Sequence, residues 1–167
     1  MEIIKIDSFL SYYERTREVT NRVIQVIPQD KLDWTYMPGK FTLADLVRHL
    51  AAIERYVFAE VVQGNPPCYK GCGKVLADGY DNIMSYYNEM NQQSMQIFKS
   101  FSDQDLQRNI KTLDGKDITI ANFLRALIVH DIHHRGAMCI YLNILNVETP
   151  AIIGLKEEDV IQLSKTK

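Results

Sequence analysis

The chain has 167 residues, of which 46% are hydrophobic and 24% charged, and its 19 basic and 21 acidic side chains give a net charge of −2. This length is enough for a single domain with its own core, and we treat residues 1–167 as one domain. The near-neutral charge argues against a dedicated nucleic-acid-binding protein, because phosphate contacts require a cationic face.

The cysteines and the hydrophobic segments bear on where the protein works. Three cysteines are too few for a disulfide framework and favour reduced thiols in the cytoplasm. The N-terminal segment carries charges every few residues and lacks the apolar stretch of a secretory signal. The most apolar stretch, residues 51–62, contains charged side chains and is too short to span a membrane. We therefore expect a cytoplasmic protein with no membrane partner.

The predicted elements are helices separated by segments rich in glycine and proline. Residues 6–27 repeat apolar side chains every three or four positions, which predicts an amphipathic helix. A second helix begins at Thr42, with Asp45 three residues later in the pattern of a capping box, and ends before Gly64. The glycines and prolines that follow, up to residue 77, predict a loop.

The second half of the chain continues the same pattern. Helices are predicted over residues 78–101 and 119–145, with a capped turn at 102–106 and a tight Asp-Gly turn at 114–115. Residues 156–165 predict a short terminal helix, and no segment alternates convincingly with period two. Four long helices with one apolar stripe each predict an all-α protein, a four-helix bundle.

The four histidines are the most informative side chains. On a helical wheel of residues 119–145, His134 lies inside the apolar stripe, His130 lies at its edge and His133 lies outside it. His130 and His134 are one turn apart, within reach of one metal ion. A third ligand must come from another helix, and His49 is the only remaining histidine. Three imidazoles with an open position are typical of a catalytic metal site. The alternative is that these histidines are ordinary polar residues of the core or the surface.

Three charged residues lie near these histidines in the helical pattern. Glu54 falls in the middle of an apolar stripe, and Asp131 also lies on the stripe of its helix. A buried carboxylate must be paired, protonated or close to a metal, and we expect Glu54 to hydrogen-bond a ligand histidine. Alternatively, the Glu54 carboxylate reaches solvent at the edge of the core. The same two interpretations are open for Asp131. Arg135 flanks the stripe, where it can orient an anionic group.

Two cysteines lie in the glycine-rich loop. Cys68 and Cys72 have no companion ligands for a structural zinc site, which normally has four. We interpret them as ordinary loop cysteines, with redox or mixed-disulfide chemistry as the alternative.

The segment around the histidines resembles a known family signature. HDIHHRGAMCIYLNIL resembles the H-x-x-x-H-R-G-Q motif of the DinB/YfiT-like superfamily, with His130, His134, Arg135 and Gly136 in the motif positions. WTYMPGKFTLADLVRHLAAIER resembles the family segment that leads to the first metal-ligand histidine, here His49. LDGKDITIANFLRALIVH and TPAIIGLKEEDVI resemble the start of the last helix and the C-terminus of family members.

This resemblance implies a four-helix bundle, commonly homodimeric, with a divalent metal held by His49, His130 and His134. Zinc and nickel are the usual metals. Characterised relatives include S-transferases that use thiols such as bacillithiol or mycothiol, a maleylpyruvate isomerase and hydrolase-like proteins. One position departs from the motif: the usual Gln after Arg-Gly is Ala137.

Two functions follow as hypotheses. The first is a metal-dependent enzyme that activates a small thiol or water for S-transfer or hydrolysis of a small molecule, with its catalytic residues unassigned. The second is a non-catalytic, metal-binding stress-response dimer, which Ala137 favours. Since an unperturbed imidazole titrates near pH ~6.5, the three-histidine site predicts that metal affinity falls below about pH 6.

Overall fold

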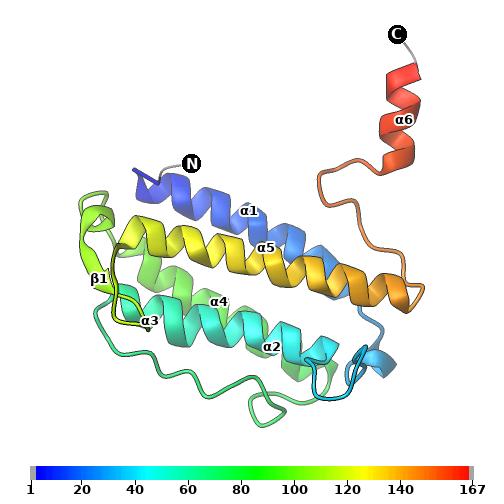
Figure 1. Ribbon diagram of the computed structural model, residues 1–167, viewed down its shortest axis with the longest axis horizontal. Helices are drawn as coiled ribbons and strands as arrows, with labels where there is room; N and C mark the ends of the chain where they lie inside the picture. Colours follow the sequence, from blue (N-terminus) through cyan, green and yellow to red (C-terminus); the bar gives the residue numbers. More distant parts are fainter. Residues whose placement is uncertain (1–2, 166–167) are drawn as a thin grey trace.

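The computed structural model describes residues 3–165, and four long helical segments form its body (Figure 1). They are α1 (Ile6–Gln25), α2 (Leu43–Ile53) with its continuation α3 (Ala59–Val62), α4 (Tyr80–Lys99) and α5 (Ile120–Ile144). Each corresponds to one helix predicted from the sequence, which confirms the all-α four-helix bundle. The shorter elements are the 3-10 turns Gln29–Lys31 and Asp105–Gln107, the strands β1 (Asn109–Lys111) and β2 (Asp117–Thr119), and the terminal helix α6 (Glu157–Lys165).

The order of the helices around the bundle differs from their order in the chain. The strongest contacts join α2 to α4 and α1 to α5, and further contacts join α2 to α5 and α1 to α4. The consecutive helices α1 and α2 therefore stand diagonally across the bundle. As a result, α2 and α5 are neighbours although residues 54–119 separate them in the chain, and the histidines lie on these two helices.

Local hydrogen bonds explain where the histidine-bearing helices begin. Thr42 Oγ1 accepts from the backbone N–H of Asp45, and the Asp45 carboxylate accepts from the N–H of Thr42, both at 3.0 Å. This is the predicted capping box. Helix α5 begins after Thr119, whose hydroxyl accepts from the N–H of Asn122 at 3.3 Å. Such caps satisfy backbone donors that a helix start leaves free.

Two features differ from the sequence expectation. The second helix is not uniformly α-helical, since a π-helical turn, η2 (Glu54–Phe58), joins α2 to α3. The Asp-Gly turn lies in a hairpin, with β1 paired antiparallel to β2. Each strand has only three residues, too few for a recognisable period-two pattern. Gly115 has a φ of +81°, a backbone conformation that glycine adopts without strain.

Helix α5 is apolar on its outer side as well as toward the core. Its inward residues are buried, yet several large apolar side chains on the other side are exposed: Val129, Ile132, Ile140 and Ile144. The terminal helix α6 projects away from the bundle (Figure 1), and none of its residues is buried. Among residues 3–165, no helix combines the length and apolar character needed to cross a membrane.

Candidate metal centre

Three histidine side chains meet between α2 and α5 and form what we call the histidine cluster: His49, His130 and His134. One ligand nitrogen from each lies within 4.8 Å of the others. The Nε2 atoms of His49 and His130 are 3.1 Å apart. Two nitrogens that bind one zinc ion tetrahedrally at about 2.0–2.1 Å are separated by about 3.3 Å. The three side chains present therefore fit a metal ion held by imidazole nitrogens.

The cluster is built from the helical register expected from the sequence. His130 and His134 are one turn apart on α5, with ring centroids 4.4 Å from each other. The His49 ring lies 4.6 Å from that of His134. His133 is exposed and is not part of the cluster, although its ring lies edge-to-face with that of His134 at a centroid distance of 4.9 Å. Of the three histidines on α5, His130 and His134 therefore lie in the histidine cluster and His133 lies outside it, in line with the helical wheel.

Burial keeps the histidine cluster uncharged at neutral pH. It is the main cause that lowers the pKa of His130 to about 3, and the neighbouring imidazoles of His134 and His49 add to it. Burial, followed by the charges of neighbouring histidines, lowers the pKa of His134 to about 4. Burial also lowers the pKa of His49. Neutral imidazole is the form that binds a metal, so the folded protein presents the cluster ready for binding.

Tyr69 is a neighbour of the cluster that the sequence did not predict. It lies in the loop between α3 and α4, and its hydroxyl is 2.9 Å from His49 Nδ1. A metal-binding histidine usually donates its second ring N–H to an oxygen, which orients the ring and fixes the tautomer. Tyr69 can accept that hydrogen bond and leave Nε2 of His49 free for a metal. By contrast, Nδ1 of His130 is buried without a hydrogen-bond partner among the described residues.

The loop that carries Tyr69 is held by the residue next to His49. Arg48 is 1% exposed, and it donates to the carbonyl oxygens of Cys72 at 2.6 Å and Ala77 at 3.0 Å. Its guanidinium group also pairs with Asp45 at 2.6 Å. Arg48 and His49 therefore contact the same loop: Arg48 binds carbonyl oxygens of the loop backbone, and His49 contacts the side chain of Tyr69. No periodicity in the sequence signals such a contact, because the loop is irregular.

Glu54 and Asp131 belong to a second polar cluster, the buried ion network, together with Arg17. Glu54 is fully buried, and its carboxylate accepts from Arg17 at 2.7 Å and from Asn91 at 2.8 Å. Asp131 accepts from the hydroxyl of Thr20. The expected hydrogen bond from Glu54 to a ligand histidine is therefore not the contact that the structure forms, because buried Arg17 on α1 supplies a charged partner.

Arg135 also points to α1 rather than to the histidine cluster. Its guanidinium donates to the Thr16 carbonyl oxygen and the Thr20 hydroxyl, each at 3.3 Å, and lies 4.0 Å from the carboxylate of Asp131. Asp131 directly follows His130 in the chain, and Arg135 directly follows His134. They fasten the face of α5 beside the histidines to α1, so their contribution to the cluster is indirect.

The loop cysteines form no disulfide: Cys68 is exposed and Cys72 is buried. Neither belongs to a metal-ligand group among the described residues, where the histidine cluster is the one group of this kind. Their interpretation as ordinary loop cysteines, with redox or mixed-disulfide chemistry as the alternative, stays a prediction.

A cavity of about 300 Å³ opens beside the histidine cluster. His134 and the exposed His133 contribute to its wall, and so does Ala137, where the family motif has Gln. Phe41 also lines this cavity, and its ring lies 5.1 Å from that of His49. A small molecule in the cavity would therefore lie next to an ion bound by the histidines.

Fold and site together define a four-helix bundle with three histidines gathered between two of its helices. Residues 12–138 match the sequence model of the DinB superfamily, and the chain belongs to that superfamily. The uncharacterized protein YjoA of Bacillus subtilis is 23% identical over 141 residues, which cover 81% of this chain and 88% of YjoA.

Solved structures share the fold. A DinB-like protein from Bacillus cereus ATCC 10987 superposes with a TM-score of 0.75 at 20% identity, covering 89% of this chain and 97% of that protein. YfiT from Bacillus subtilis superposes with a TM-score of 0.63 at 18% identity, covering 86% of this chain and 89% of YfiT. YfiT is described as a probable metal-dependent hydrolase with an unusual four-helix bundle topology. At these identities the likeness establishes the fold alone.

Proposed function

We propose that the histidine cluster holds a divalent metal ion, zinc or nickel, and that the protein is a metal-dependent enzyme acting on a small molecule. The observation that carries this proposal is the convergence of three uncharged imidazoles from two helices, with ligand atoms within 4.8 Å of one another. The description of YfiT as a probable metal-dependent hydrolase supports the same function.

The donor set suits a catalytic ion better than a structural one. Structural zinc sites are usually closed by four protein ligands, whereas three leave a position for water or substrate. When bound, the ion lowers the pKa of a coordinated water or of a small thiol such as bacillithiol, which supplies a nucleophile at neutral pH. Tyr69 orients His49, and the cavity next to His134 holds the substrate. We assign no general base, since Glu54 is engaged by Arg17.

We also propose that the working form is a cytoplasmic homodimer without a nucleic-acid or membrane partner. The four large apolar side chains that α5 exposes support a self-association face, because exposed apolar side chains gathered on one helix face are typical of interaction sites. Light scattering at micromolar concentration tests the dimer: a species of 19.3 kDa rather than twice that mass would contradict it.

A second function, metal binding without catalysis, has one observation in its favour. Ala137 lines the cavity at the position where the family motif places Gln, so the hydrogen bonds of that amide are missing beside His134. Turnover of an electrophile that requires both the metal and a small thiol, or hydrolysis that requires the metal alone, would decide for the enzyme. Stoichiometric metal without either activity would decide for the second function.

The metal site itself is tested by metal analysis of the purified protein and of single variants. His130→Ala and His134→Ala should abolish stoichiometric zinc or nickel, and His49→Ala should weaken binding strongly. His133→Ala is the matched control, because it removes an imidazole from the same helix that points outward, and it should retain the metal. Loss of metal in His133→Ala but not in His134→Ala would overturn the assignment.

A further inference from the structure

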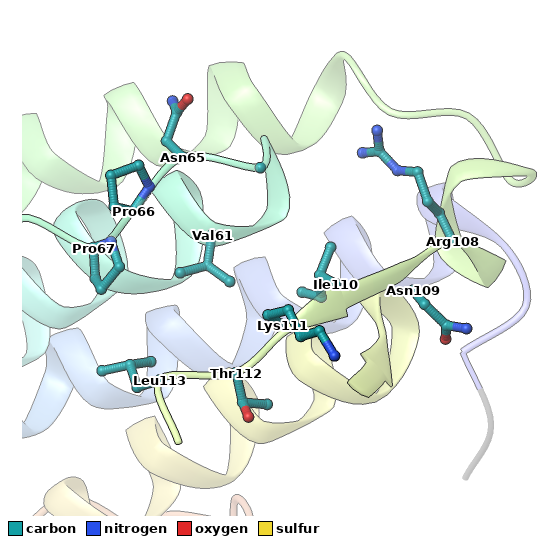
Figure 2. Close-up of a pocket in the computed structure, with 11 residues that line it drawn as sticks. Val61, Asn65, Pro66, Pro67, Arg108, Asn109, Ile110, Lys111, Thr112 and Leu113 are labelled. Carbon is teal, nitrogen blue, oxygen red and sulfur yellow. The ribbon is translucent and has the colours of Figure 1, made fainter. Parts of the chain in front are cut away.

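The cavities of the protein differ in whether their basic side chains already have partners. A cavity of about 700 Å³ lies between residues 64–67 and β1 at the hairpin (Figure 2). Arg108 there donates to the carbonyl oxygen of Val62 at 3.1 Å, and Lys111 pairs with Asp117 at 2.8 Å. Its cations are therefore engaged by the protein itself, and no histidine lines it.

The cavity of about 300 Å³ beside His134 has a different character. Its walls are mostly apolar, and three of them are the aromatic rings of Tyr36, Phe41 and Tyr141. The rings of Tyr36 and Tyr141 pack against each other with centroids 5.4 Å apart. The volume is at the lower end of the range that small-molecule sites occupy. Such walls favour a compact ligand with an aromatic or branched aliphatic body.

One basic side chain, Lys40, lies in this wall, and no acidic side chain accompanies it. Within the part of the chain that the structure describes, no carboxylate forms an ion pair with Lys40. Lys40 is exposed. A lysine that lines an otherwise apolar cavity and has no carboxylate partner favours a ligand with a single negative charge, since charge complementarity sets specificity.

We propose that this cavity binds a small, largely apolar ligand that carries one carboxylate, with its body against Tyr36, Phe41 and Tyr141 and its carboxylate on Lys40. Ala137 leaves space for the body, because a longer side chain there would occupy the wall next to His134. The proposal names the substrate class of the histidine site and rests on the proposed function for that role. Binding to the cavity does not itself require the metal.

The only tryptophan of the chain provides the measurement. Trp34 packs edge-on against Tyr141, with ring centroids 5.4 Å apart, so a ligand in the cavity should change its fluorescence. The full-length protein is titrated with phenylbutyrate and with phenylbutanol, which has the same body but no charge. We expect saturable binding of both, with phenylbutyrate about threefold tighter, as is typical of a partly exposed ion pair.

Variants separate the charge from the body of the ligand. Lys40→Met should remove the threefold preference for phenylbutyrate and leave phenylbutanol unchanged. Lys111→Met, the same change at the hairpin, should retain the preference. Ala137→Gln should weaken both ligands by at least about threefold, because it fills the cavity.

The titration is made on zinc-loaded protein and on protein treated with a chelator. The preference should be present in both, so that a direct bond between carboxylate and metal is not its cause. Preference only with zinc, equal binding of both probes or no saturable binding would overturn the proposal. If the protein binds no metal but retains the Lys40-dependent preference, the proposed metal function fails and the ligand site stands.

Discussion

Two polar clusters lie inside the same bundle, and they differ in what their polar atoms contact. In the buried ion network, both oxygens of Glu54 and the guanidinium of Arg17 are bonded within the protein. In the histidine cluster, two ring nitrogens face each other, Nδ1 of His130 has no partner among the described residues, and a cavity opens alongside. A polar cluster satisfied by the protein serves stability, whereas imidazole nitrogens that converge on one another beside a cavity are suited to bind a ligand.

The contrast is not complete, because the buried ion network also contains a polar atom without a hydrogen-bond partner among the described residues. Oδ2 of Asp131 is buried without a hydrogen-bond partner among residues 3–165, and burial raises the pKa of Asp131 to about 6. Burial therefore raises the pKa of Asp131 but lowers the pKa values of the histidines, so the two clusters change the stability in opposite directions as the pH falls.

The largest effect should come from breaking the ion network. Arg17→Ala leaves the Glu54 carboxyl group buried without its main partner, and we expect it to lower the free energy of unfolding by about 3–5 kcal/mol. Urea denaturation of the metal-free protein measures this cost. The control is Arg17→Met combined with Glu54→Leu, which leaves no unpaired charge and should recover most of the loss. A cost below about 1 kcal/mol for Arg17→Ala would place this pair with surface ion pairs.

The metal-free protein should lose stability as the pH falls from about 7 to 5. The pKa values of His130, about 3, and His134, about 4, lie below the ~6.5 of an unfolded imidazole, so the unfolded chain binds protons that the folded protein does not. We expect a loss of about 2 kcal/mol for the pair after discounting for partial exposure, measured by urea denaturation at each pH.

The control for this pH effect exploits the opposite sign of Asp131. Its folded pKa, about 6, lies above the ~3.9 of an unfolded aspartate, so the folded protein binds the extra proton and gains stability as the pH falls below about 6. Replacing His49, His130 and His134 by Gln should therefore leave a protein more stable at pH 5 than at pH 7, because burial lowers the pKa of all three histidines. A triple variant that loses as much stability as the wild type would contradict this account.

A smaller effect should follow from removing the hydroxyl group that orients His49. Tyr69→Phe retains the ring but removes the 2.9 Å contact with Nδ1, and we expect zinc affinity to fall about tenfold in a competition titration. Tyr12→Phe, the same change on the exposed surface of α1, should have no effect. If the two variants bind zinc equally well, Tyr69 does not act through His49.

The smallest effect concerns metal affinity and pH. Protons bind His130 and His134 only near pH 3 to 4 in the folded protein, so zinc affinity should change by no more than about threefold between pH 7.5 and about 5.5. This revises the fall below about pH 6 that unperturbed histidines predict. A steep loss of zinc near pH 6 in the folded protein would show that the cluster is more hydrated than its burial indicates.

The sequence by itself determined the four helices and which faces of them turn inward. Apolar spacing and a capping box are local, so they predicted the start of α2 after Thr42 and the inward direction of His130 and His134. The hairpin strands and the π-helical turn were not predicted from the sequence, because each is shorter than the window in which a period can be recognised. His49 followed as the only histidine on another helix, and the signature resemblance pointed to the same residue.

Only the tertiary structure decided the partners of the buried charges and of the loop. Arg17 and Glu54 are 37 positions apart and meet because α1 and the helix of Glu54 lie in one bundle, while Tyr69 reaches His49 because Arg48 holds an irregular loop. A helical wheel shows that a side chain points inward but not which side chain it contacts in the core. That choice depends on the packing of helices distant in the chain, where a buried charge must find an opposite charge or lose several kcal/mol of stability.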